Sequence, residues 1–117
     1  MSLLTTTTRL AATGPVLKII GDLDYETASE LRKALDSLSI AAGQTLVLDL
    51  AGLDFCDSSG ISALISARNL AIEQGGAIAL AAVPANTLRI LGIVGLDQVF
   101  TILSDPATAT NRDLMTG

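Results

Sequence analysis

The stretch TLVLDLAGLDFCDSSG, residues 45–60, decides which fold we expect for this chain. Residues 45–50 are apolar on both faces of an extended chain, as a central strand of a covered sheet requires. The next segment, residues 51–60, is read as a turn that ends in two serines and a glycine. A helix is predicted after it, over residues 59–73, and two following glycines end it. A buried strand that leads through a turn into a helix indicates an α/β fold.

The same kinds of signal continue on both sides of this unit. A Thr-rich run, a Gly-Pro turn and an apolar run predict a β-hairpin before it, and residues 21–24 are expected to break the second strand. Asp24 is a candidate N-cap for the helix that follows. The other predicted elements are hairpin strands over 3–12 and 16–20, a helix over 25–39, strands over 77–83 and 99–103, and a helix over 84–94. A short terminal helix or tail is predicted over 104–117.

Strands and helices that alternate in this way build a single mixed sheet through right-handed crossovers. We therefore predict an α/β fold with a mostly parallel sheet of about five strands, an antiparallel hairpin at its N-terminal edge and about four helices. A length of 117 residues fits one domain. Residues 1–117 are read as that domain, with its core over about 3–103.

The composition excludes several classes of function. Half of the residues are hydrophobic, which fits a globular protein. The net charge is -5, and a negative charge is the wrong sign for binding nucleic acid. The chain contains no histidine, which excludes Ser-His-Asp and Cys-His catalysis and histidine metal sites. We expect no metal and no other cofactor, and we read the single cysteine, Cys56, as a small core residue in a reducing compartment.

The expected location is the cytoplasm. The longest apolar stretch is far shorter than the roughly 20 residues that a membrane-spanning helix needs. The N-terminus has neither the charged nor the apolar region of a signal peptide. No association with a membrane is therefore predicted.

The residues that could carry chemistry gather around Asp57 and the two serines after it. They stand just beyond the carboxyl end of a predicted strand and before a helix, where α/β sheets place their sites. One interpretation is that Ser58 or Ser59 caps the helix. The other is that a serine here is phosphorylated, because unpaired backbone N–H groups and the helix dipole would tolerate a phosphate.

Two further aspartates, Asp22 and Asp24, follow the preceding strand and are expected at the same edge of the sheet. An aspartate pair with this spacing also occurs in phosphoryl-transfer enzymes, but the chain has no phosphate-binding loop and few basic residues. The serines also lack the glycine spacing and the histidine partner of a nucleophile elbow. The sequence therefore favours a protein that is not an enzyme.

The stretch LDFCDSSGI, residues 53–61, resembles the motif of the STAS domain of bacterial anti-sigma factor antagonists. The strand end IIGDLD over 19–24, the strand LVLDL over 46–50 and the segment 91–100 resemble the same family, and the similarity covers about residues 3–103. This resemblance implies partner switching. The unphosphorylated protein binds an anti-sigma factor that is also a serine kinase, a sigma factor is released, and phosphorylation by that kinase ends the association.

The resemblance also implies which residues take part. The acceptor is the first serine after the motif aspartate, Ser58, and a metal-dependent serine phosphatase resets it. Asp24 and Asp57 match positions near the contact surface, and Ser59, Gly60, Ile61 and Ser62 at the start of the helix lie beside them. Asp22, expected at the same edge of the sheet, is also predicted to bind the partner. Related STAS domains belong to transporters and stress-sensing assemblies, so a scaffold subunit that is never phosphorylated is the alternative. A monomer or weak dimer is expected.

Overall fold

The computed structural model describes residues 3–104. These residues form one five-stranded sheet, three α-helices and a short 3-10 helix. The elements in chain order are β1 (Leu4–Ala11), β2 (Gly14–Leu23), α1 (Ala28–Asp36), β3 (Thr45–Cys56), α2 (Ser58–Glu73), β4 (Ala77–Ala81), α3 (Ala85–Ile93), η1 (Leu96–Gln98) and β5 (Thr101–Leu103). The terminal helix or tail was predicted over residues 104–117, and all of these except residue 104 lie outside the described part of the chain.

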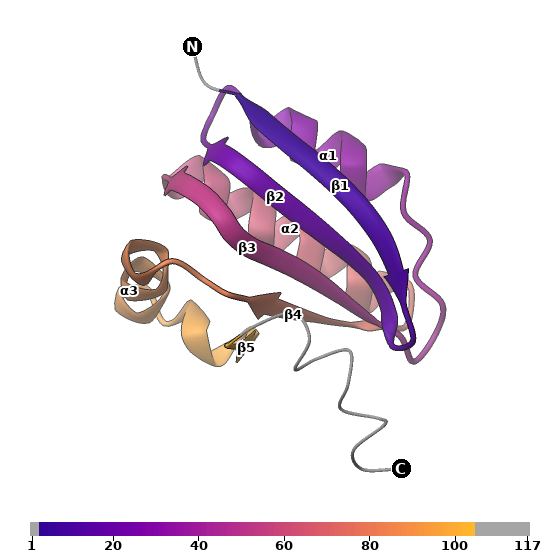
Figure 1. Cartoon of the computed structure of the whole chain (residues 1–117). Helices are drawn as coiled ribbons and strands as arrows, with labels where there is room; N and C mark the ends of the chain where they lie inside the picture. Colours follow the sequence, from indigo (N-terminus) through magenta and orange to yellow (C-terminus); the bar gives the residue numbers. More distant parts are fainter. Residues whose placement is uncertain (1–2, 105–117) are drawn as a thin grey trace.

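The sheet has the strand order β1-β2-β3-β4-β5 (Figure 1). The first two strands form the antiparallel hairpin, and every later pair is parallel. Parallel neighbours need a crossover between them, and the helices supply it. The predicted fold class, a mostly parallel mixed sheet with an antiparallel strand at its edge, is confirmed.

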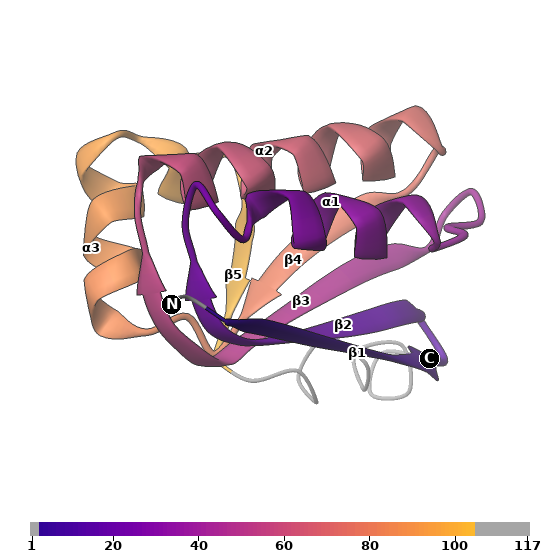
Figure 2. The same ribbon diagram turned by 90° about the horizontal axis from the view of Figure 1, so that it is seen from above.

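Helices α1 and α2 lie on one face of the sheet, with α1 over the hairpin side and α2 beside it (Figures 1 and 2). The main core fills the space between them and the strands. Helix α1 buries Ala28, Leu31 and Leu35, which share one side of a helix. Helix α2 buries small residues, including Ala63, Ala67 and Ala71. Small side chains let a helix approach its neighbours closely, and α2 contacts α1, β3 and β4.

The other face of the sheet has no helix over it among the described residues (Figure 2). A second, smaller apolar cluster lies there, made by Val16, Val47 and Ala81. Strand β3 thus has buried apolar side chains on both faces, as predicted for residues 45–50.

Several predicted boundaries were wrong. Strand β2 continues through residues 21–23, which were expected to break it, and β3 continues to Cys56 through the predicted turn. The reason is their mutual pairing, which brings Gly21 opposite Leu53 after one shift of register and Leu23 opposite Cys56 after a second. Such pairing stabilises a strand beyond the limit that local sequence suggests.

The other boundary errors have local causes. Strand β4 ends two residues early because the next residue, Ala82, has a positive φ of 53° and turns the chain. Strand β5 is also two residues shorter than predicted, because Val99 ends the 3-10 helix and Phe100 donates a backbone hydrogen bond to Leu96.

Candidate functional site

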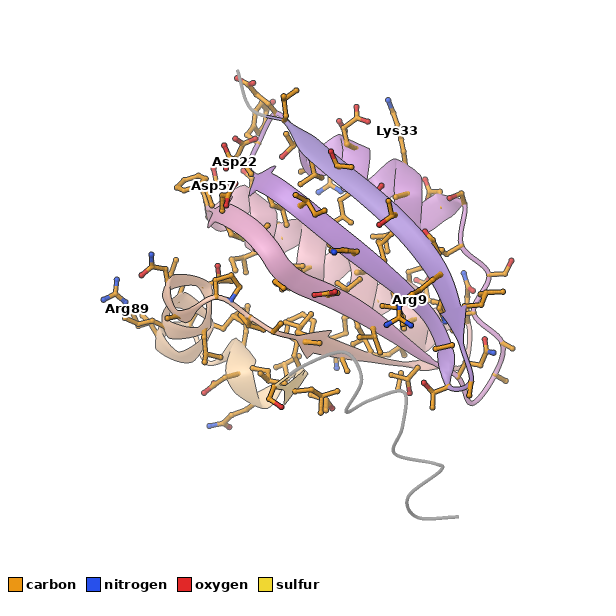
Figure 3. All side chains as sticks on the ribbon, in the orientation of Figure 1. Arg9, Asp22, Lys33, Asp57 and Arg89 are labelled. Carbon is orange, nitrogen blue, oxygen red and sulfur yellow. The ribbon has the colours of Figure 1, made fainter. Side chains whose placement is uncertain are left out.

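The carboxyl ends of β2 and β3 meet at one edge of the sheet, and the predicted site residues stand there. The pairing of Leu23 with Cys56 aligns the two ends. The backbone N–H of Asp57 donates to the carbonyl oxygen of Leu23 at 3.3 Å, which ties the start of α2 to the end of β2. Asp22 and Asp57 consequently stand at the same edge of the sheet, as the sequence predicted (Figure 3).

Asp57 is the N-cap of α2. Its carboxylate accepts a hydrogen bond from the backbone N–H of Gly60 at 3.0 Å, and its backbone is extended. This satisfies one of the amide groups that a helix leaves unpaired at its start. The helix itself begins at Ser58. The interpretation of Ser58 or Ser59 as the cap is therefore wrong, because the preceding aspartate already occupies that position.

Ser58 is exposed at the first residue of α2. Within residues 3–104 no group makes a hydrogen bond to its hydroxyl. Ser62, one helical turn later, is also exposed, and Ser59 between them is half-buried. The hydroxyl of Ser58 is thus available to another molecule, and the fold does not depend on it.

Gly60 and Ile61 are buried beneath this surface. A Cβ on Gly60 would collide with the carbonyl oxygen of Leu23 and stand 2.7 Å from the Sγ of Cys56. Only glycine allows the helix to begin so close to the end of β2. The structure gives these two residues a packing role, and their direct contact with a partner stays a prediction.

Asp24 holds a tight turn before α1. Its carboxylate accepts from the backbone N–H groups of Glu26 and Thr27 at 3.0 and 3.1 Å. The helix begins only at Ala28, with Thr27 at the N-cap position and no capping hydrogen bond from its side chain. The prediction of Asp24 as N-cap of a helix over 25–39 is therefore wrong, because the aspartate caps the preceding turn instead.

Thr27 is a site residue that sequence reasoning missed. Its side chain is buried, accepts a hydrogen bond from the N–H of Asp24 at 2.9 Å and donates one to the carbonyl oxygen of Asp22 at 2.7 Å. It therefore fixes the backbone of both predicted aspartates. The only available signal was a threonine three residues after an aspartate, a spacing at which side chains bond to local backbone.

A groove of about 550 Å³ opens between the start of α1, with the turn before it, and the first turn of α2. It is lined by Tyr25, Glu26, Ala28, Ser29, Arg32, Ser59 and Ser62. Sequence reasoning missed Tyr25, which is 84% exposed, and Phe55, which is 53% exposed near the end of β3. Exposed aromatic side chains are enriched in the contact surfaces of proteins, so this edge of the sheet combines carboxylates, hydroxyls and apolar rings.

Cys56 is buried next to the site, as predicted for a small core residue. Burial, and to a lesser degree the carboxylate of Asp57, raise the pKa of its thiol to about 11. The thiol therefore stays protonated near neutral pH, and a protonated thiol is a poor nucleophile.

In the range 3–104 there is no group of three or more cysteine, aspartate or glutamate side chains that could hold a metal ion. Every helix in that range is too short or too polar to cross a lipid bilayer.

Comparison with known proteins gives the family. The family described as "Mlab, STAS domain" matches residues 6–104. The anti-sigma-F factor antagonist RsfB of Mycobacterium tuberculosis is 30% identical over 102 residues, which are 87% of this chain and 79% of the relative. An anti-sigma F factor antagonist of Paenibacillus polymyxa is 27% identical over 95 residues, 80% of this chain and 81% of the relative.

A solved structure agrees with the sequence relatives. The crystal structure of an anti-sigma factor antagonist from Mycobacterium paratuberculosis superimposes with a TM-score of 0.76 and 25% identity, and the match covers 92% of this chain and 91% of that one. The family match spans most of the described residues, including both strand ends and the whole of α2. The chain therefore belongs to the STAS domain family and, within it, to the anti-sigma factor antagonists.

Proposed function

We propose that this protein works by partner switching, as a single domain with no catalytic activity of its own. In its unphosphorylated form it binds an anti-sigma factor that is also a serine kinase, and the sigma factor held by that kinase is released. The kinase phosphorylates Ser58, the complex dissociates, and a metal-dependent serine phosphatase restores the binding form.

The observation that carries this proposal is the division of roles between two neighbouring residues. Asp57 caps α2 through its hydrogen bond to Gly60, while the hydroxyl of Ser58 is exposed at the first helical position. A kinase needs access to the hydroxyl it modifies, and modification must leave the domain folded. Both conditions favour Ser58 as the acceptor.

A phosphate on Ser58 would leave the helix stable and would weaken the binding of a partner. The N-terminus of a helix favours negative charge because of its dipole. A phosphoserine adds about two negative charges, next to the carboxylate of Asp57. If a partner carboxylate lies about 6 Å away, Coulomb's law with an effective dielectric constant of about 20 gives roughly 3 kcal/mol for each pair of unit charges. That energy corresponds to a change of about two decades in affinity, so the charge alone can dissociate the complex without any refolding of the domain.

The proposed contact surface is the rim around Ser58. The partly or fully exposed residues there are Asp22, Asp24, Ser59 and Ser62. Gly60 and Ile61 are buried beneath them. The groove that contains Tyr25 continues this surface toward α1. A partner seated on the rim would cover Ser58 directly.

The test compares four baits in a pull-down from a lysate of the source organism: wild type, Ser58→Ala, Ser58→Asp and Ser39→Asp. Ser39 is exposed just after α1 and so adds the same charge away from the rim. We expect an ATP-binding kinase on every bait except Ser58→Asp. With ATP, the captured kinase should phosphorylate wild type at Ser58, read by mass spectrometry, and leave Ser58→Ala unmodified.

Two outcomes would count against partner switching. Retention of the same kinase by Ser58→Asp would show that negative charge at this position does not control binding. Capture of one transporter or stress-signalling complex by all four baits would support the alternative, a scaffold STAS subunit that is never phosphorylated.

A further inference from the structure

The two edges of the sheet differ in length. Strand β5 has three residues, and such a short edge offers little backbone for another chain to pair with. Strand β1 has eight residues and pairs with β2 in an uninterrupted register. Its sequence, LTTTTRLA, has one charged residue and no proline, and no strand pairs with its outer side among the described residues. Charged residues, prolines and bulges usually keep a long edge strand from pairing with another chain, and β1 has only one charged residue and neither of the other two features.

The hydrogen bonds to β2 show which backbone groups of β1 point outward. The carbonyl oxygen of Leu3 accepts from the N–H of Asp22 at 3.1 Å, so Leu3 faces β2. In an antiparallel ladder the residues of one strand alternate between facing the neighbour and facing away. The residues of β1 that direct their N–H and C=O groups away from the sheet are therefore Leu4, Thr6, Thr8 and Leu10.

We propose that β1 pairs antiparallel with β1 of a second copy, around a two-fold axis that passes between the two Thr7 residues. In this register Leu4 lies opposite Leu10 of the second copy, and Thr6 lies opposite Thr8. All four outward-facing residues then donate and accept a backbone hydrogen bond across the axis. A register centred on Thr6 would leave Leu10 without a partner in β1 of the second copy. The centre at Thr7 gives every outward-facing residue of β1 such a partner.

The side chains fit the same register. Residues with even numbers in β1 point to the helix-covered face, because Thr6 and Thr8 pair with the core residues Ile19 and Leu17. Leu10 is 84% exposed in the single chain, and the pairing sets it beside Leu4 of the other copy, which packs against the core. Opposed apolar and β-branched pairs are the favourable contacts of a sheet.

The charge on β1 does not oppose the pairing. Arg9 lies on the helix-free face (Figure 3) and comes opposite Thr5 of the second copy, so the two arginines do not face each other. The axis lies in the middle of β1, whereas Ser58 stands at the end of β3. The interface is therefore separate from the proposed partner surface and does not rest on the proposed function.

The first experiment measures molar mass by sedimentation equilibrium over a wide range of concentrations of the full chain. We expect a shift from one chain to two as concentration rises. Thr8→Pro removes an outward-facing N–H and leaves the bonds to β2 intact, so it should abolish the shift. Leu10→Lys should do the same without a backbone change. The matched control is Ile93→Lys, which replaces a 77% exposed residue of α3 and should dimerise like wild type.

The second experiment tests the register by mild oxidation of single cysteine variants. Thr7→Cys brings two cysteines together across the axis at a Cα separation of about 4.5 Å, which a disulfide can bridge. Thr5→Cys is the control, because its two copies would be about 14 Å apart along the strands. We expect a cross-linked dimer from Thr7→Cys alone, since the native Cys56 is buried in both variants.

Three results would overturn the proposal: a single-chain mass at every concentration, a dimer that survives both Thr8→Pro and Leu10→Lys, or equal cross-linking of the two cysteine variants. Ser58→Asp should dimerise like wild type. Failure of this interface and failure of partner switching are thus distinguished by different variants.

Discussion

The carboxylate of Asp57 accepts a hydrogen bond of 3.0 Å from the backbone N–H of Gly60. This contact caps the helix whose first residue is Ser58. Both partners also meet the end of β2, because the N–H of Asp57 donates to Leu23 and Gly60 packs against the same residue. The proposed phosphorylation site therefore stands on a helix start that is fixed without the serine itself.

Asp57→Ala should lower the free energy of unfolding by about 1 kcal/mol, because the cap of α2 is lost. Ser58→Ala should change it by less than about 0.5 kcal/mol, since the hydroxyl supports nothing in the fold. Urea denaturation measures both, and Asp57→Asn, which can still cap, is the control. Equal losses for Asp57→Ala and Ser58→Ala would contradict the assignment of the cap.

Gly60→Ala should destabilise the protein by about 1–3 kcal/mol, because the added methyl group must displace Leu23 or Cys56. The matched control is Gly92→Ala in α3, where the nearest atom, an Oδ2 of Asp97, would be 3.7 Å from the new Cβ. Alanine is the better helix former, so that change should stabilise by roughly 0.5–1 kcal/mol. Thermal unfolding of the two variants should shift in opposite directions; a shift in the same direction would argue against the tight contact.

Thr27→Val should cost about 1–3 kcal/mol, because it leaves the N–H of Asp24 and the carbonyl of Asp22 without their buried partner. Thr27→Ser keeps the hydroxyl and should recover most of that loss. Urea denaturation of the pair checks the expectation. A valine variant as stable as wild type would contradict the role of the hydroxyl, and a serine variant as unstable as the valine variant would show that the methyl group contributes as much as the hydroxyl.

The thiol of Cys56 should make stability fall at high pH. Its pKa is raised from 9.0 to about 11 in the folded protein, so the unfolded chain loses this proton first. The free energy of unfolding should therefore decrease as the pH rises from about 9 to about 11, and the contribution is fully present below that window. Cys56→Ala should remove this part of the slope in urea titrations at successive pH values. Identical slopes for the two proteins would contradict the raised pKa.

The positions of the helices and strands along the chain could be predicted because their signals are local. The apolar runs of β3 and β4, the helical spacing of α2 and the turn between β1 and β2 are each contained in a few neighbouring residues. The crossover rule then restricts such an order of elements to a mostly parallel sheet. The serine pair at the start of α2 could be placed for the same reason.

The ends of β2 and β3 and the identity of the caps could not be predicted in this way. Residues such as Gly21 and Gly52 end strands by local preference, yet both strands continue because they pair with each other. Asp57, Ser58 and Ser59 are all good capping residues, and the choice among them depends on where β3 ends and α2 begins.

By itself the sequence determined the α/β class, the order of the elements and the place of Ser58 between a strand and a helix, because periodicity and turn residues act over short distances. Only the tertiary structure decided that Asp57 caps α2, that Thr27 joins Asp22 to Asp24, and that the hydroxyl of Ser58 is exposed. These features depend on the pairing of β2 with β3, whose residues are about thirty positions apart in the chain, and no local pattern records which residues that pairing brings together.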